Sequence, residues 1–281
     1  MQNLNNQLPK DLNSIKNLIA VKDDSLENPV RHTGQEYLKF INTKVFSEAS
    51  AYYLKHGTYT HAPEGTSEHR EFWDREENRC KNGYTVGGVR ITGEHYAYLN
   101  YGRILATVGH GKRQRKIDTF PKFLDMDYYW YHELEQAEQN GEGMIVVKAR
   151  RKGYSYKNAF GMVWRYNWFP FSISILAAYE KTFWSNTMEM AKNMINFINE
   201  NTDWVKGLLI DRQDHIKSGY IEKDPVSGVN IQKGYKAELL ALSFKDSPHK
   251  SVGRTAERML FEEAGDWPGL IQAYQRSYPL F

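Results

Sequence analysis

Residues 148–155, with the sequence Lys-Ala-Arg-Arg-Lys-Gly-Tyr-Ser, have the residue types of a phosphate-binding loop. They directly follow the apolar run 144–147 and precede a stretch with helical periodicity. A strand, a basic glycine-containing loop and a helix form a geometry in which backbone N–H groups and the positive helix N-terminus face an anion. The hydroxyl of Ser155 would then reach Mg²⁺. We therefore predict a site for nucleotide phosphates at this loop.

The loop departs from the usual phosphate-loop pattern, which has Lys between the Gly and the Ser or Thr. Tyr154 occupies that position, and Lys148 lies five residues before Gly153, at the end of the predicted strand. Its four-carbon stem can carry the ammonium back toward the β- and γ-phosphates. The predicted nucleotide contacts are Lys148, Arg150, Arg151, Lys152, Gly153, Tyr154 and Ser155. For the loop alone, a basic surface turn without a ligand is the alternative interpretation.

Two adjacent acids, Glu262 and Glu263, follow the apolar residues 259–261. In phosphate-loop ATPases an acid at such a strand end holds Mg²⁺, while another residue orients the attacking water. Adjacent side chains on a strand point to opposite faces, so the two acids have different roles. We predict that Ser155 and Glu262 hold Mg²⁺, with the longer side chain of Glu262 acting through water. Glu263 is the predicted catalytic base.

Phosphoryl transfer requires charge stabilisation more than covalent chemistry. Arg150 or Arg151 would supply it at the γ-phosphate as an arginine finger from the same chain.

The two motifs resemble those of phage terminase large subunits, the ATPases that pump DNA into empty capsids. The loop is similar to the deviant phosphate loop of the lambda-type members, and 243–265 is similar to their acidic-pair region. Segments 91–93 and 98–102 are similar to those before the ATPase core, so the resemblance spans residues 90–270. It departs at Glu262, where the family usually has Asp. The loop residues on the family pattern are Lys148, Arg151, Gly153, Tyr154 and Ser155.

The resemblance implies an α/β fold of the P-loop NTPase type, in the additional-strand, catalytic-Glu class. Its sheet would be mainly parallel and flanked by helices, with a small N-terminal α+β lobe. The implied activity is ATP hydrolysis with Mg²⁺ that drives double-stranded DNA into the procapsid. The implied partners are the portal protein and the small terminase subunit, and the active form is a homo-oligomeric ring in the host cytoplasm at the procapsid portal. The family spacing favours Arg151 over Arg150 as the finger.

Terminase large subunits continue past the acidic pair with a coupling motif, further strands and a nuclease domain. This sequence ends at Phe281, eighteen residues after Glu263. We expect either a fragment or split gene product with an incomplete sheet, or a fold completed in another way, and no nuclease activity. A helicase-like or recombination ATPase, or a non-catalytic nucleotide-binding assembly protein, are the alternatives.

Composition is compatible with this interpretation. Hydrophobic residues make up 41% and charged residues 25% of the 281 residues, which is usual for a globular protein. A net charge of +3 allows local contact with DNA but does not predict a basic coat over the whole surface. The single cysteine, Cys80, excludes an internal disulfide, and no apolar run is long enough to span a membrane.

Three regions are predicted along the chain: a polar, loosely ordered N-terminus at 1–30, a helix and short-strand lobe at 31–117, and the ATPase domain at 118–281. Within the lobe we expect a helix from Gly34 to His56. A charged loop at 58–82, short strands from Tyr84 to Ile104, and an exposed basic loop at 112–116 complete it. That basic loop is interpreted as a solvated hairpin tip, with contact to DNA phosphates as the alternative.

Periodicity in the ATPase domain predicts alternating helices and strands, and hence parallel strand pairing. The predicted elements are a helix at 118–139, a strand at 144–147, a helix after Ser155, a strand at 173–178, a helix containing Trp184 to Ile198, an edge hairpin within 208–234, and strands at 240–244 and 259–261.

Other candidate sites are weaker. His56, His61, His69 and Cys80 lack the close paired spacing of a zinc site. Ser155 lacks the second glycine of a nucleophile elbow.

Phe120 and Pro121 are candidates for an adenine pocket, because in nucleotide-binding folds of this class the segment before the loop-bearing strand often supplies one. Core packing is the favoured role for both.

Overall fold

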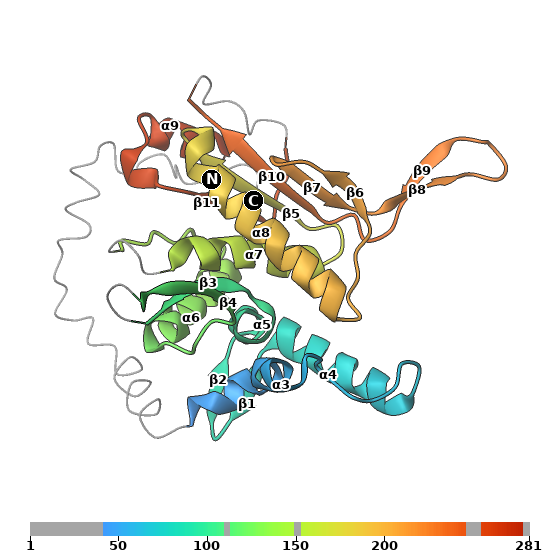
Figure 1. The fold of residues 1–281 in the computed structure, drawn as a ribbon. Helices are drawn as coiled ribbons and strands as arrows, with labels where there is room; N and C mark the ends of the chain where they lie inside the picture. Colours follow the sequence, from blue (N-terminus) through green and yellow to red (C-terminus); the bar gives the residue numbers. More distant parts are fainter. Residues whose placement is uncertain (1–41, 110–112, 149–152, 246–253, 278–281) are drawn as a thin grey trace. The chain divides into compact units, whose positions relative to one another are not determined.

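A five-stranded mixed sheet forms the centre of the fold (Figure 1). The computed structural model describes residues 42–109, 113–148, 153–245 and 254–277. The sheet order is β11 (Arg258–Phe261), β5 (Ile173–Ala178), β10 (Glu238–Ser243), β7 (His215–Ser218) and β6 (Leu208–Asp211). β5 pairs in parallel with β10 and β11, whereas β7 pairs in an antiparallel way with β10 and β6. The prediction of an α/β fold is confirmed.

The sheet is mixed rather than mainly parallel because β6 and β7 are joined by a short connection. Such a connection can link only antiparallel neighbours, whereas a parallel pair needs a long crossover. The connection from β5 to its parallel neighbour β10 is long: it begins with helix α8 (Lys181–Asn201) and continues through β6 to β9 (residues 208–233). Residues 42–281 form one compact unit, so the predicted boundary between residues 117 and 118 stays a prediction. The predicted N-terminal region 1–30 lies outside the described residues.

The two faces of the sheet are covered by different elements. Helices α7 (Tyr154–Trp168) and α8 pack against each other and against β5 and β10. Trp184 of α8 donates a hydrogen bond from Nε1 to Ser243 Oγ at 2.7 Å. Side chains alternate along a strand, so Leu240 and Leu242 of the same strand lie on the other face. There they join a second apolar cluster with Ile175 and Ala256.

Helix α9 (Leu270–Ser277) covers this second face near β11. Its Ala273 packs in a cluster with Ala177 of β5, Phe244 and Trp267.

The apolar positions predicted for α7 and α8 are confirmed as core. Burial of one helical stripe explains why the 3.6-residue period located both helices. These core residues are Phe160, Val163, Trp164, Trp184, Met188, Ala191, Ile195 and Ile198. None of the described helices is both long and apolar enough to cross a membrane.

The predicted charged loop at 58–82 is wrong for most of its length. Helix α4 (Ser67–Asn82) occupies it, capped by Thr66, whose Oγ1 accepts from His69 N at 3.2 Å. Its buried face consists of His69, Trp73, Glu76 and Cys80. Two of these four residues are polar, so the stripe carries little hydrophobic signal.

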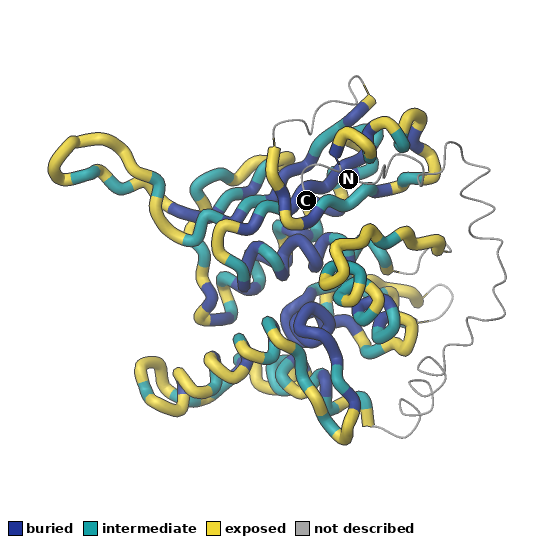
Figure 2. Tube along the Cα trace, turned by 180° about the vertical axis from the view of Figure 1, so that it is seen from behind, coloured by how far each residue is buried: buried dark blue, intermediate teal, exposed yellow. Residues whose placement is uncertain are grey.

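The strands predicted from Tyr84 to Ile104 are correct only in part. β1 (Tyr84–Val86) and β2 (Val89–Ile91) form a hairpin, but helix α5 (Gly93–Tyr101) follows. All nine residues of α5 are buried, and it is the dark blue coil at the centre of Figure 2. A helix buried on every side has no amphipathic period, and its aromatic residues favour strands by propensity. Tertiary packing overrides both signals.

The remaining N-terminal elements agree more closely with expectation. A short 3₁₀ turn, η3 (Thr43–Ser47), leads into α3 (Glu48–His56), which ends at Gly57 with φ of 72°. The part of the predicted helix before residue 42 lies outside the described residues.

The predicted basic loop belongs to a hairpin of β3 (Ile104–Val108) and β4 (Arg115–Thr119). Arg115 and Lys116 are exposed, and residues 110–112 of its tip lie outside the described residues.

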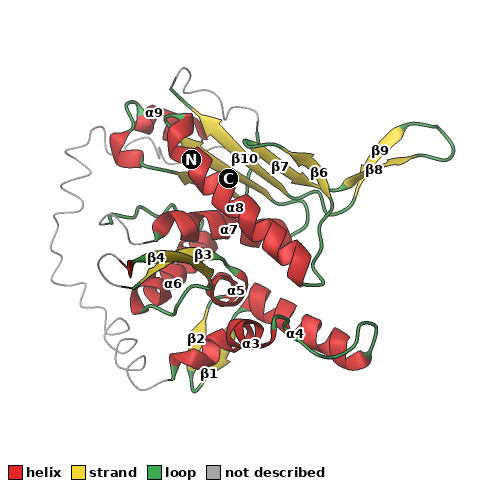
Figure 3. Cartoon of the chain, viewed as in Figure 1, coloured by secondary structure: helices red, strands yellow, loops and turns green. Residues whose placement is uncertain are grey.

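Two further predictions are correct only in part. The helix predicted from residue 118 begins at Asp125, because β4 extends to Thr119, and the hairpin predicted at the sheet edge forms a separate two-stranded sheet. Helix α6 (Asp125–Asn140) ends at Gly141, whose φ of 68° is in the left-handed region that glycine adopts readily. The runs on either side of residues 223–228 form the hairpin of β8 (Tyr220–Lys223) and β9 (Asn230–Lys233), which extends away from the main sheet (Figure 3).

The strand predicted at 144–147 is wrong. These residues have no regular secondary structure, and Ile145 and Val147 are 79% and 77% exposed. A strand exists only through hydrogen bonds to a neighbour. β11 is the edge of the sheet, and none of the described strands pairs with 144–147 or with the outer edge of β11.

A buried ion network joins β11 to the helices. Arg258 donates two hydrogen bonds to Glu94 of α5, from Nη1 at 3.0 Å and from Nη2 at 2.7 Å. Its Nε donates to Glu138 of α6 at 2.8 Å, and Glu138 also accepts from Arg165 of α7 at 2.8 Å. Burial alone would lower the pKa of Arg258, but the carboxylates of Glu94 and Glu138 outweigh it and raise this pKa above its usual value.

Gly161 of α7 makes room for this network. A Cβ at Gly161 would lie 2.5 Å from Arg258 Nη1 and 2.7 Å from Glu94 Oε1.

We predict that Arg258→Leu lowers the free energy of unfolding by about 3–5 kcal/mol, because it leaves the Glu94 carboxylate buried without its partner. The double variant Arg258→Leu/Glu94→Leu is expected to be more stable than the single variant. Chemical denaturation of both proteins measures the difference. A double variant less stable than Arg258→Leu would contradict the role given to the pair.

His95 of α5 provides a pH-dependent contribution to stability. Its ring is fully buried and stacks on Phe123 and Tyr131, and neither ring nitrogen has a hydrogen-bond partner among the described residues. Burial, then the charges of His132 and Lys157, lower the pKa of His95 well below its usual value of about 6.5.

We predict that the free energy of unfolding falls as the pH drops below about 6.5, because the unfolded chain binds a proton there that folded His95 rejects. The slope of this single group reaches about 1.4 kcal/mol per pH unit until the folded pKa is reached. In His95→Phe the slope of the free energy of unfolding against pH is expected to be smaller by the contribution of one bound proton. Denaturation between pH 7 and pH 5 measures it, with His61→Phe at an exposed histidine as control. Equal slopes for His95→Phe and the parent would refute the assignment.

Candidate functional site

The structure brings Ser155 and Glu262 together at the carboxyl ends of β5 and β11. Ser155 is the second residue of α7, and its Oγ donates to Glu262 Oε1 at 3.1 Å. Glu262 directly follows β11, and its backbone N–H donates to Ala177 O at 2.8 Å. This bond holds the acid at the edge of the sheet where ligands bind in parallel α/β folds. The two residues predicted to share Mg²⁺ are therefore neighbours, although 107 residues separate them.

The second acid of the pair has a different environment. Glu262 is 7% exposed, whereas Glu263 is exposed and lies 3.8 Å from Lys148, measured from Oε1 to Nζ. Glu263 adopts φ of 49° and ψ of 42°, a left-handed conformation that costs a non-glycine residue of order 1–3 kcal/mol. This turn ends the strand and directs the second carboxylate to the lysine at the start of the predicted loop.

Arg150, Arg151 and Lys152 of the predicted loop lie outside the described residues. Gly153 is the N-cap of α7, with φ of 75°. Tyr154 lies with its ring 3.8 Å from Lys157 Nζ and contacts Trp130 edge-on. Where the usual pattern has its phosphate lysine, the ring of Tyr154 instead packs against α6.

Sequence reasoning missed two residues that contact Glu262. Asn158 Nδ2 donates to Glu262 Oε2 at 3.0 Å, and Thr187 Oγ1 donates to Glu262 Oε1 at 3.4 Å. The signals were present in the sequence. Asn158 lies three residues after Ser155 and so shares its helix face. Thr187 is a polar residue within the apolar stripe of α8 between Trp184 and Ala191.

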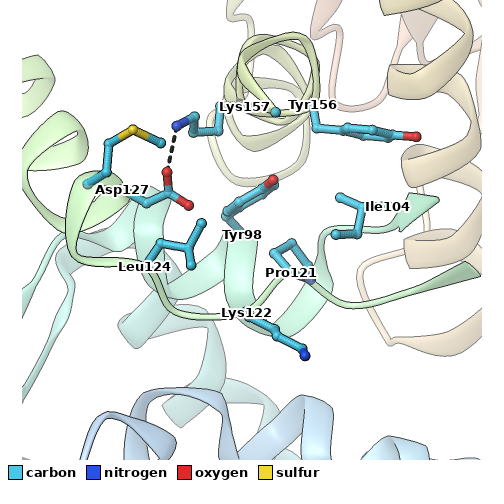
Figure 4. A pocket seen from close by; sticks show the side chains of 10 residues that line it. Tyr98, Ile104, Pro121, Lys122, Leu124, Asp127, Tyr156 and Lys157 are labelled. Atoms are coloured by element: carbon cyan, nitrogen blue, oxygen red, sulfur yellow. Dashed lines mark hydrogen bonds and ion pairs between the residues drawn. The ribbon is translucent and has the colours of Figure 1, made fainter. Parts of the chain in front are cut away.

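A cavity of about 440 Å³ opens beside the N-terminus of α7 (Figure 4). This volume is in the range of about 300–1,000 Å³ that small-molecule sites occupy. The lining is mainly apolar, with two lysines and one aspartate. The lining residues are Tyr98, Ile104, Pro121, Lys122, Leu124, Met126, Asp127, Gly153, Tyr156 and Lys157.

A buried ion pair closes one side of this cavity. Lys157 Nζ lies 2.5 Å from Asp127 Oδ1, and both side chains are almost fully buried. Burial, only partly offset by the partner's charge, lowers the pKa of Lys157 and raises the pKa of Asp127. Figure 4 shows the second carboxylate oxygen of Asp127 on the side of Tyr98.

The first turns of α7 present two groups of side chains on different faces. Ser155 and Asn158, three residues apart, face Glu262. Gly153, Tyr156 and Lys157, also three and four residues apart, line the cavity. Both groups belong to the first turns of α7, where backbone N–H groups have no partner within the helix and can bind an anion.

Phe120 and Pro121 have separate roles. Pro121 lines the cavity, whereas Phe120 is buried in the core beneath Arg103, whose guanidinium lies 4.5 Å from the ring centre.

The residues considered as zinc ligands lie in different environments. The rings of His56 and His61 are 5.2 Å apart, and His69 pairs with Trp73 Nε1 at 3.2 Å. Cys80 is buried, which raises the pKa of its thiol well above the usual value. In the parts of the chain that the structure describes, no three His, Cys, Asp or Glu side chains form a group that could hold a metal.

The oxygens of Ser155 and Glu262 fit Mg²⁺. Hydroxyl and carboxylate oxygens are hard ligands, and Mg²⁺ is usually bound by one or two carboxylates together with substrate phosphates and water. The donor set at Glu262 therefore suits an ion that arrives with a nucleotide.

Comparison of the sequence with protein-family models and with curated proteins finds no match.

Proposed function

We propose that this chain is the ATPase of a terminase-type packaging motor, which hydrolyses ATP with Mg²⁺ to move double-stranded DNA into a procapsid. The observation that carries the proposal is the hydrogen bond between Ser155 and Glu262 at 3.1 Å. In phosphate-loop ATPases the loop Ser or Thr and an acid on a neighbouring strand hold Mg²⁺. Packaging of DNA, rather than another use of ATP, is proposed from the resemblance of the two motifs to terminases.

The proposed mechanism assigns one task to each group. The N–H groups of the first turn of α7 bind phosphate oxygens, helped by the absence of acidic residues in that turn. Lys148 neutralises the β- and γ-phosphates, and Glu263 beside it orients the attacking water. Arg150 or Arg151 stabilises the charge that develops at the γ-phosphate. Mg²⁺ held by Ser155 and Glu262 would neutralise phosphate oxygens when bound.

The cavity beside α7 is the proposed site of the nucleotide base. Tyr98, Tyr156 and Pro121 supply apolar surface, and Gly153 connects the cavity to the phosphate loop. The second carboxylate oxygen of Asp127 can accept a hydrogen bond from an exocyclic amine of the base. This contact would account for the preference for ATP that the resemblance to terminases implies.

The proposed partners follow from the same resemblance. They are double-stranded DNA, the portal protein and the small terminase subunit, with the chain in a homo-oligomeric ring at the procapsid portal in the host cytoplasm. Arg115 and Lys116 on the β3–β4 hairpin are exposed and are candidates for contacts with DNA phosphates.

A non-catalytic nucleotide-binding assembly protein is the second candidate. It is favoured by residues 144–147, which pair with none of the described strands, so that Lys148 does not follow a strand as a phosphate lysine would.

Turnover separates the two candidates. We predict that Glu263→Gln lowers ATP hydrolysis by about 10² to 10⁴-fold, the usual contribution of a general base. Lys148→Ala is expected to weaken both nucleotide binding and hydrolysis, because it removes the positive charge that would face the phosphates. Phosphate release under excess Mg²⁺ and ATP measures the rates.

Matched controls for these variants are Glu189→Gln and Lys223→Ala, at exposed positions on α8 and β8. Both are expected to keep the parental rate. Hydrolysis at the parental rate by Lys148→Ala and Glu263→Gln would reject the catalytic assignment. A parent that binds ATP without turnover would favour the second candidate.

We predict that Tyr156→Ala weakens ATP binding by about 5- to 150-fold, the equivalent of the 1–3 kcal/mol that an aromatic side chain contributes by stacking on a base. Tyr156→Phe, which keeps the ring but loses the hydroxyl that accepts from Leu105 N, is expected to bind nearly as the parent does. Competition against a fluorescent ATP analogue measures both affinities. Inorganic tripolyphosphate should compete equally in all three proteins. An equal loss of tripolyphosphate binding in Tyr156→Ala would show that the cavity does not hold the base.

A further inference from the structure

The carboxylate of Glu262 is held on both oxygens by three neutral donors from two helices. Ser155 and Asn158 of α7 donate to Oε1 and Oε2, and Thr187 of α8 donates to Oε1. Glu262 is 7% exposed and Thr187 is 2% exposed, so water contributes little to the solvation of this group. The site is therefore built around one carboxylate.

No ion pair compensates this buried acid within the described residues. The nearest described lysine of the loop, Lys148, lies beside Glu263 instead. A buried carboxylate that has hydrogen bonds but no opposite charge is a favourable position for a cation, because the cation supplies the missing charge.

The three donors differ in what they can do when a cation binds. Ser155 and Thr187 carry hydroxyl oxygens, whereas Asn158 presents its amide nitrogen, because an ionised carboxylate only accepts hydrogen bonds. A nitrogen that donates a hydrogen bond does not bind a cation. Asn158 can therefore keep its bond to Oε2 while Oε1, at 3.1 Å from Ser155 Oγ, is offered to the ion.

Glutamate needs such support more than aspartate does. Its side chain has one more rotatable bond, and ordering each flexible side chain opposes binding through lost rotamer freedom. Two fixed donors on opposite oxygens remove that freedom before the ion arrives. Removing a residue that hydrogen-bonds a metal ligand commonly lowers the metal affinity by about 10–100-fold.

We propose that Asn158 and Thr187 are positioning residues that orient Glu262 as a ligand for a divalent cation and so set the Mg²⁺ concentration at which the nucleotide binds. This inference rests on the proposed function, because the cation is the one that accompanies ATP. It adds two residues, from α7 and α8, that the phosphate-loop and acidic-pair motifs do not include.

The test measures binding rather than turnover. The purified chain is mixed with a fluorescent ATP analogue, and Mg²⁺ is added stepwise. The Mg²⁺ concentration that gives half-maximal binding of the analogue is recorded. Asn158→Ala and Thr187→Val are expected to raise it about tenfold or more, whereas Thr187→Ser, which keeps the hydroxyl, stays near the parent. Saturating Mg²⁺ is expected to restore analogue binding in both variants, because the phosphate and base contacts are intact.

The matched control is Asn167→Ala, a buried asparagine on the same helix that bonds Val163 O, far along α7 from Glu262. It is expected to keep the parental Mg²⁺ dependence. A shift of the same size in Asn167→Ala would mean general damage to α7 and would overturn the inference.

Two further outcomes separate this inference from the proposed function. If the parent binds the analogue with Mg²⁺ and Asn158→Ala and Thr187→Val show the parental half-saturation, the positioning role is wrong and the proposed function stands. If the parent shows no Mg²⁺-dependent binding, the proposed function fails and the inference fails with it.

Discussion

The buried contact between Arg258 and Glu94 is the constraint on which the rest of the site depends. Arg258 lies four residues before Glu262 on the acidic strand, and Glu94 lies on the fully buried helix α5. A buried charge that loses its partner is costly, so any shift of β11 against the helices that separates the pair is disfavoured. The contact therefore fixes β11 against the helices, and with it the place from which the two acids emerge. Gly161 permits the close approach of α7 to this pair.

Helix α7 organises the chemistry that this arrangement makes available. Its first turns place Ser155 and Asn158 against Glu262 and Tyr156 and Lys157 in the wall of the cavity. The N-terminal turns of α7 therefore bond the Glu262 carboxylate with one set of side chains and line the apolar cavity with another. The proposed nucleotide site is an arrangement of α7 with β11, α5 and α6, rather than a property of the loop alone.

Elements with a strong local period were predictable, and those without one were not. The stripes of α7 and α8 located both helices, because each buries one apolar face. Helix α4 was missed because its buried face includes His69 and Glu76, and α5 was missed because it is buried on all sides. The apolar run 144–147 has the composition of a strand, but strand formation depends on a partner elsewhere in the chain.

The sequence by itself determined the two motifs, their order and the residue types that meet at the site. The meeting of Ser155 and Glu262 was predicted from the two motifs. Different surroundings for the adjacent acids were predicted from strand alternation, although both acids follow the end of β11 and a left-handed turn at Glu263 separates their side chains. Tertiary structure alone decided that Lys148 lies beside Glu263 and that Asn158 and Thr187 bond Glu262. It also decided that the cavity lies beside α7. These contacts join residues from elements far apart in the chain, and their distances depend on how the helices pack on the sheet.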